Sequence, residues 1–114
     1  YLNENYWNYD LDYIENMQFT YYDSNENGCY VKHQDSECHN LPVKRKLSLI
    51  TQLSDSSEYE GGEILLHVSN NPIKIPKRKG LVISFPSYVL HEVTPVTSGE
   101  RYSLVSWIHG NLLK

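Results

Sequence analysis

Cysteine is scarce in this 114-residue sequence, which contains only Cys29 and Cys38. Two cysteines are too few for the disulfide framework of a small secreted domain. The first residues, Tyr1-Leu2-Asn3-Glu4, are neither basic nor apolar, so no signal peptide is expected. No segment approaches the roughly 18 consecutive apolar residues of a membrane-spanning helix. These absences favour a reduced, cytoplasmic protein.

Positive charge is also limited. Lysine and arginine total 10 and aspartate and glutamate total 14, which gives a net charge of −4. This balance disfavours a general nucleic-acid binder, whose affinity depends on neutralising phosphates. Hydrophobic residues make up 39% and charged residues 21%, a composition typical of a folded domain. The length fits one domain over residues 1–114.

Helical periodicity is missing after Met17, where short β-branched and aromatic segments alternate with turn residues. These segments are predicted to be strands at 18–22, 29–35, 46–54, 63–68, 73–75, 81–85, 88–93 and 101–108. Short strands at regular spacing are typical of an antiparallel sandwich or a double-sheet jelly roll. The predicted fold is therefore mostly β, a jelly roll with few or no supporting helices. The 10 tyrosines predict aromatic packing between sheets or a cavity lined by polar groups.

Turn residues predict how some strands connect. Asn27-Gly28 is a strong hairpin signal, so residues 18–35 are predicted to form a hairpin. Thr97-Ser98-Gly99 is predicted to separate the last two strands. Gly61-Gly62 is predicted to be a bulge or tight turn where backbone segments approach closely.

His33-Gln34-Asp35 carries the most chemical information. Side chains alternate along a strand, so His33 and Asp35 are expected on one face. An imidazole and a carboxylate make half of a metal site, and His91, on a later strand, is the candidate third ligand. Two histidines and one carboxylate form the facial triad of non-haem Fe(II) oxygenases, which leaves positions open for substrate and oxygen.

Arg101 strengthens this interpretation. It follows His91 on the next predicted strand, and the corresponding strands of a jelly roll lie close together. A guanidinium pairs bidentately with a carboxylate. It could therefore bind the far end of a dicarboxylate that chelates iron with its near end.

Five segments together resemble the 2-oxoglutarate- and Fe(II)-dependent dioxygenases, most closely the prolyl 4-hydroxylase-like branch of bacteria and phages. The resemblance covers residues 18–109. The segments are Tyr30-Val31-Lys32-His33-Gln34-Asp35, Leu47-Ser48, Tyr59-Glu60-Gly61-Gly62-Glu63-Ile64, Gly80-Leu81-Val82-Ile83-Ser84-Phe85-Pro86, and His91-Glu92-Val93-Thr94-Pro95-Val96-Thr97-Ser98-Gly99-Glu100-Arg101.

The resemblance implies a jelly-roll enzyme that uses Fe(II), 2-oxoglutarate and O2, with ascorbate as a further expected ligand. His33, Asp35 and His91 would hold the iron, and Arg101 would bind the distal carboxylate of 2-oxoglutarate. Apolar residues would line the cosubstrate pocket: Ile50, Ile64 and Val105.

Aromatic residues are also implicated by the resemblance. Tyr22 resembles a tyrosine that hydrogen-bonds the cosubstrate, and Tyr30 and Trp107 resemble aromatics beside the substrate. Gln52 departs from the family pattern, because relatives often carry an aromatic residue there. The implied reaction converts 2-oxoglutarate to succinate and CO2 and hydroxylates an unactivated C–H bond. A proline in a peptide or protein is the expected target, and a free amino acid, a small metabolite or a nucleobase is the alternative.

Purely structural roles for the candidate site residues stay open as alternatives. His33 and Asp35 could form an exposed pair on a strand, and Arg101 could be an ion-pair partner of Glu92 or Glu100. Tyr22, Tyr30 and Trp107 could simply pack within a sheet. The whole chain could be a jelly-roll binding module without catalysis.

A zinc site is a further alternative. Its ligands would be Cys29, His33, Cys38 and His39, but their spacing matches no common zinc motif and leaves His91 and Arg101 unexplained. The basic segments, 44–46 and 74–79, are most simply solvated surface.

Overall fold

The computed structural model describes residues 11–15, 17–25, 28–33 and 44–110, and for Asp12, residues 30–33 and Lys44 it describes the backbone alone. Two antiparallel sheets make up this part of the chain. The one helical element in it is a 3-10 turn, Ser56–Glu58, which Asp55 begins with a capping box. No helix within these ranges is long and apolar enough to cross a membrane.

The larger sheet is built around one long strand, β10 (Val96–Gly110). β10 lies between β1 (Leu11–Ile14) and β4 (Lys44–Gln52), and β4 pairs in turn with β8 (Val82–Pro86). β2 (Gln18–Asp23) and β5 (Tyr59–Gly61) also pair with β10. The long strand is therefore the common partner of strands from both halves of the sequence.

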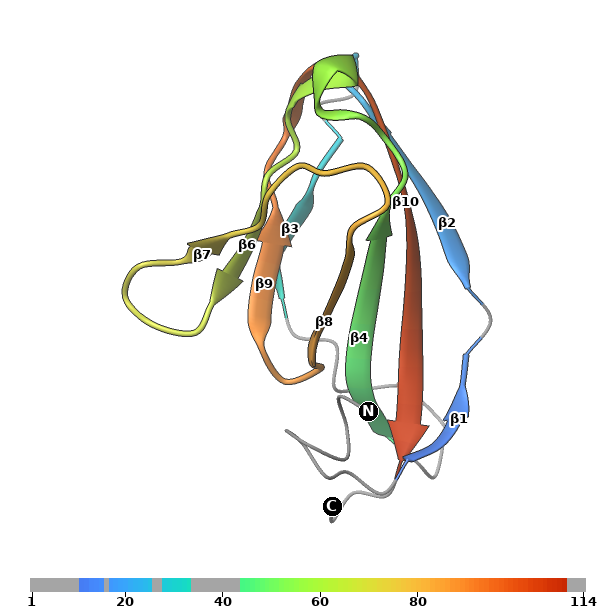
Figure 1. Ribbon diagram of the computed structural model, residues 1–114. Helices are drawn as coiled ribbons and strands as arrows, with labels where there is room; N and C mark the ends of the chain where they lie inside the picture. The colour runs from blue at the N-terminus through green and yellow to red at the C-terminus, as the bar shows by residue number, and fades with distance from the viewer. Residues whose placement is uncertain (1–10, 16, 26–27, 34–43, 111–114) are drawn as a thin grey trace.

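The smaller sheet has the order β3-β9-β6-β7. Its strands are β3 (Tyr30–His33), β9 (Leu90–Val93), β6 (Ile64–His67) and β7 (Ile73–Lys74). It faces the larger sheet, as Figure 1 shows, with β9, β6 and β3 on one side and β4, β10 and β2 on the other. The predicted fold class, a mostly-β jelly roll, is confirmed.

The hydrophobic core fills the space between the two sheets. Ile50 and Phe85 come from the larger sheet, and Ile64, Leu66 and Val93 from the smaller one. All are at most 8% exposed. Burying such side chains contributes about 1.5–3 kcal/mol each. The alternation of buried and less buried residues along β6 and β9 follows directly from the pleat.

The predicted hairpin over residues 18–35 is wrong. β2 pairs with β10 in the larger sheet, whereas β3 pairs with β9 in the smaller one. The chain turns at Ser24-Asn25, directly after β2, but the two strands belong to different sheets.

The predicted turn at Thr97-Ser98-Gly99 is also wrong. Those residues lie inside β10, where Gly99 has a φ of 78° and β5 runs alongside. Thr94 and Pro95, between β9 and β10, are outside the strands instead.

Gly61 behaves as the sequence predicts. It has a φ of 74°, and a Cβ at this position would lie 2.1 Å from the carbonyl oxygen of Pro95. Only glycine permits this close approach of β5 to the start of β10.

Tyrosines occupy both faces of the larger sheet, not only its interior. On the outer face, the ring of Tyr102 lies 5.0 Å from that of Tyr21 and 5.6 Å from that of Phe19, measured between centroids. Tyr21 and Phe19 are exposed. Tyr59 is buried, 4% exposed. The prediction of aromatic packing between sheets therefore holds for only part of the set.

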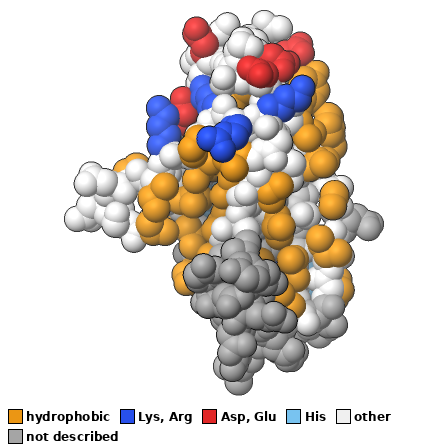
Figure 2. Space-filling view, viewed as in Figure 1, with side chains coloured by type: hydrophobic (Ala, Val, Ile, Leu, Met, Phe, Trp, Pro, Cys, Tyr) orange, Lys and Arg blue, Asp and Glu red, His pale blue; other side chains and the backbone are white. Residues whose placement is uncertain are grey.

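The basic residues of 74–79 are partly neutralised by one carboxylate. The Nζ atoms of Lys77 and Lys74 lie 3.1 and 3.6 Å from Oε1 of Glu63. Figure 2 shows lysine and arginine side chains grouped above the hydrophobic middle of this face. Cys29 is exposed and is not in a disulfide, whereas Cys38 lies outside the described residues.

Candidate functional site

A cavity opens between the two sheets and contains about 460 Å³ of space, its open mouth included. Ten side chains line it: Gln18, Thr20, Tyr22, Ile50, His91, Val93, Arg101, Ser103, Val105 and Trp107. His91 and Val93 come from β9, and the others come from β2, β4 and β10 of the facing sheet. The cavity therefore has one wall from each sheet.

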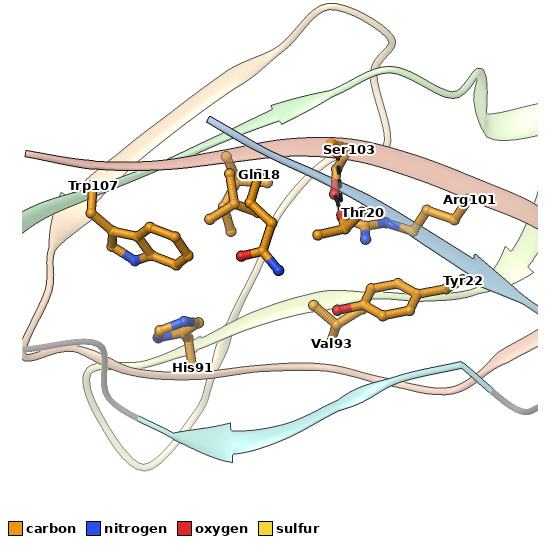
Figure 3. Close-up of a pocket in the computed structure, with 10 residues that line it drawn as sticks. Gln18, Thr20, Tyr22, His91, Val93, Arg101, Ser103 and Trp107 are labelled. Carbon is orange, nitrogen blue, oxygen red and sulfur yellow. Dashed lines mark hydrogen bonds between the residues drawn. The ribbon is translucent and has the colours of Figure 1, made fainter. Parts of the chain in front are cut away.

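His91 lies at one end of this cavity, opposite Trp107 (Figure 3). Its side chain is 3% exposed, and its ring packs edge-on to Phe85 at 4.8 Å between centroids. Its Nδ1 is 2.8 Å from the carbonyl oxygen of Val89. Because a carbonyl can only accept, Nδ1 is the donor of this hydrogen bond, and in the neutral ring the lone pair that a metal needs is then on Nε2.

Of the other two predicted iron ligands, the structure describes only the backbone of His33. The backbone of His33, on β3, is the direct partner of His91 on β9. Asp35 and the side chain of His33 lie outside the description. The ligand set therefore stays a prediction. Tyr30 is placed by its backbone opposite Val93.

Arg101 lies at the other end of the cavity, beside Tyr22 (Figure 3). It is 2% exposed, and its Cζ is 5.7 Å from the centroid of the Tyr22 ring. Burial lowers the pKa of its guanidinium, which Tyr59 and Tyr22 partly oppose. Its Nη2 is buried and has no hydrogen-bond partner among the described residues.

The suggested ion pairs of Arg101 with Glu92 or Glu100 do not form. Glu92 instead bonds His67 at 2.7 Å, and Glu100 accepts a hydrogen bond from the Tyr102 hydroxyl at 3.2 Å. A buried cationic donor that lacks a protein acceptor is costly, unless a ligand supplies the acceptor. A carboxylate is the group that fits a guanidinium best.

Three directly opposed residue pairs of β2 and β10 line the cavity between His91 and Arg101. They are Gln18 with Val105, Thr20 with Ser103, and Tyr22 with Arg101. The hydroxyls of Thr20 and Ser103 share a short hydrogen bond, and Thr20 Oγ1 also donates to the Ser103 carbonyl at 3.2 Å.

The sequence interpretation missed Gln18, Thr20, Val93 and Ser103. An available signal was the two-residue alternation, because residues that alternate with Tyr22 and Arg101 share their face.

The remaining predicted cosubstrate residues fall into two groups. Ile50 and Val105 lie on the cavity wall. Ile64 is 2% exposed and belongs to the hydrophobic core cluster, not to the lining of the cavity. Gln52 turns away, since its Nε2 donates to the carbonyl of Pro76 at 2.7 Å.

Trp107 is held from outside the cavity by a charged pair. The guanidinium carbon of Arg45 lies 3.8 Å from the indole centroid, a cation–π contact. Glu15 accepts from Arg45 Nε at 2.7 Å and from Nη2 at 3.2 Å. Glu15 also bonds the fully buried His109. Nε1 of Trp107 is buried without a hydrogen-bond partner in the part of the chain described.

Glu15 should stabilise the fold in a pH-dependent way. Burial alone would raise its pKa, but hydrogen bonds from Arg45 and His109 outweigh burial and lower it. A lowered folded-state pKa gives stability that is present at neutral pH and lost as the pH falls through that pKa. We expect Glu15→Gln to lower the free energy of unfolding by about 1–3 kcal/mol at neutral pH and far less in acid.

Urea unfolding at both pH values measures this difference. The control is Glu60→Gln, at an exposed position of β5. An equal loss for Glu15→Gln at neutral and acid pH would show that the charge of Glu15 contributes nothing.

Comparisons with known proteins agree with this geometry. The family model of the 2OG-Fe(II) oxygenase superfamily matches residues 17–109. A PKHD-type hydroxylase of Alteromonas mediterranea is 33% identical over 88 residues, which cover 73% of this chain and 39% of that protein. The chain thus spans about two fifths of the length of this curated relative.

Two solved structures share the fold. A prolyl-4-hydroxylase of Pseudomonas putida superposes with a TM-score of 0.78 at 23% identity, covering 96% of this chain and 59% of that one. A viral collagen prolyl hydroxylase of Paramecium bursaria Chlorella virus 1, solved as its 2OG complex, gives 0.73 at 26% identity, covering 96% and 65%. With the family model matching most of its length, this chain belongs to the 2OG-Fe(II) oxygenase superfamily.

Proposed function

We propose that this chain is the oxygenase core of a dioxygenase that uses Fe(II), 2-oxoglutarate and O2 to hydroxylate an unactivated C–H bond. The observation that carries the proposal is the pairing, in one cavity, of His91 at one end with buried Arg101 at the other. An imidazole able to ligate a metal, and a guanidinium whose Nη2 has no partner among the described residues, suit the two ends of a dicarboxylate chelator.

The described residues fit the iron and the cosubstrate. His91 presents Nε2 as the lone-pair nitrogen, and its Nδ1–H bond to Val89 fixes the ring orientation. His33 and Asp35 would complete the ligand set. When bound, the iron supplies the oxygen chemistry, with release of succinate and CO2 from 2-oxoglutarate.

The chain itself supplies binding, orientation and exclusion of water. Arg101 would bind the distal carboxylate, where burial strengthens the charged contact. Ile50 and Val105 would shield the middle of the cosubstrate from solvent, and Tyr22 lies beside the carboxylate-binding end.

The proposed substrate is a proline in a peptide or protein, hydroxylated at carbon 4. Support comes from the PKHD-type and prolyl hydroxylase relatives and from the position of Trp107 opposite His91. An indole at the metal end offers a flat apolar surface for a pyrrolidine ring. Tyr30 is the second proposed substrate contact.

Turnover of 2-oxoglutarate tests the proposal. Iron-loaded protein is incubated with 2-oxoglutarate and O2, with and without a proline-containing peptide, and succinate and peptide mass are measured. We expect peptide-dependent succinate and a gain of one oxygen atom in the peptide.

Each other outcome has a distinct meaning. Succinate without peptide oxidation would contradict the peptide substrate and favour a free amino acid or small metabolite. No succinate from folded, iron-loaded protein under any condition would contradict the oxygenase and leave a binding module.

A further inference from the structure

Tyr59 lies behind Arg101, outside the cavity lining, and contacts it from a different strand. Tyr59 begins β5 and is 4% exposed. β5 pairs with the first part of β10, where Tyr59 is directly opposite Gly99. The phenol of Tyr59 acts on the Arg101 guanidinium and opposes the lowering of its pKa by burial. Tyr59 therefore approaches Arg101 from β5, whereas the ring of Tyr22 approaches it from β2.

Two glycines bring Tyr59 to this position. Gly99 has a φ of 78°, and a Cβ there would lie 2.0 Å from the carbonyl oxygen of Glu58 and 3.0 Å from Cα of Tyr59. Gly62 has a φ of 58°, and a Cβ there would lie 3.0 Å from Cδ of Arg101 and 3.2 Å from Cε2 of Tyr59. The stem of Arg101, the ring of Tyr59 and the backbone of Gly62 therefore meet in direct contact.

The Tyr59 ring is fixed by a further contact. Nζ of Lys77 lies 4.7 Å from the ring centroid and 3.1 Å from Oε1 of Glu63. The ion pair with Glu63 holds the lysine over the ring. The side chain of Lys77 is only 20% exposed. Tyr59 thus has little freedom to rotate away from Arg101.

We propose that Tyr59, packed against Gly62, is a positioning residue that aims the guanidinium of Arg101 at the distal carboxylate of 2-oxoglutarate. The inference rests on the function proposed above. A phenol packed beside the arginine stem restrains rotation of the guanidinium, whose Nη2 has no hydrogen-bond partner among the described residues. Holding the fork in one orientation removes a cost that the ligand would otherwise pay on binding.

Two ligands that differ by one carboxylate test this role. We compare 2-oxoglutarate with 2-oxopentanoate, which keeps the metal-chelating end and lacks the distal carboxylate. Dissociation constants are measured by calorimetry on Fe(II)-loaded protein without oxygen. Tyr59→Phe, which keeps the ring, should raise the Kd for 2-oxoglutarate about 10-fold. The Kd for 2-oxopentanoate should stay within about 2-fold, because that ligand does not use Arg101.

Controls separate positioning from a general structural effect. Tyr88→Phe, at a 61% exposed position, should leave both constants unchanged. In an Arg101→Ala background, adding Tyr59→Phe should cause no further loss of 2-oxoglutarate affinity, because the residue acts only through Arg101. Iron content of every variant is measured alongside.

The outcomes are distinguishable. Parallel weakening of both ligands by Tyr59→Phe would show a structural role and overturn the inference, as would no weakening of either. If the unsubstituted protein itself binds both ligands equally, the role proposed for Arg101 fails, and the inference fails with it. Preference for 2-oxoglutarate that persists fully in Tyr59→Phe overturns the inference alone.

Discussion

Replacing His91 with alanine is expected to abolish stable Fe(II) binding and, with it, succinate formation. Removing a partner that merely orients a metal ligand already costs about 10–100-fold in metal affinity. Removing one of three ligands should therefore cost at least about 100-fold. Iron content after desalting and succinate formation measure the two effects.

The matched control is His67→Ala. His67 is on the neighbouring strand β6, and its Nε2 bonds Glu92 at 2.7 Å. That variant should keep its iron. Folding of both variants is checked by circular dichroism, since His91 is buried against Phe85. Iron retained by folded His91→Ala at the normal level would remove this residue from the ligand set.

Replacing Arg101 with alanine is expected to weaken 2-oxoglutarate binding strongly while iron stays bound. A desolvated bidentate contact is worth ~2–5 kcal/mol, or about 30-fold to several thousand-fold in Kd. The effect should be large because Arg101 is 2% exposed and has an unpartnered Nη2 in the described structure. Calorimetry on iron-loaded protein without oxygen gives the Kd.

Two further variants serve as controls, a lysine substitution of Arg101 and an alanine substitution of an arginine outside the cavity. Arg101→Lys keeps the charge but loses the planar fork, so an intermediate Kd is expected. Arg78→Ala, on the exposed connection from β7 to β8, should leave the Kd unchanged. If Arg101→Ala binds 2-oxoglutarate as tightly as the unsubstituted protein, the distal carboxylate is bound elsewhere.

The sequence predicted the kind of fold well, because its two-residue alternation and its turn residues are local signals. It did not predict which strands pair. The segments on either side of Asn27-Gly28 look like a hairpin, yet β2 joins β10 and β3 joins β9. Pairing depends on contacts between residues far apart in the chain, and no local pattern encodes them. For the same reason, the sequence did not predict that β10 continues through Thr97-Ser98-Gly99.

The candidate site could be predicted where a residue type carries the chemistry by itself. His91 and Arg101 are such residues, and the structure places both on one cavity. Thr20 and Ser103 were not predicted, because hydroxyl side chains occur on many strands. Only the pairing of β2 with β10, which puts these two residues directly opposite each other, identifies them as part of the site. Ile64 was assigned to the cosubstrate pocket, yet an apolar strand residue serves equally well in the core, which is where it packs.

The central claim is that His33, Asp35 and His91 meet at one ferrous ion while Arg101 binds the far end of 2-oxoglutarate. A crystal structure of the protein grown without oxygen with Fe(II) and 2-oxoglutarate, with iron located by its anomalous scattering, tests it most directly. We expect one iron site ligated by these three side chains and a cosubstrate carboxylate on the Arg101 guanidinium. Iron bound at other residues, or the three side chains directed away from a common point, would contradict it.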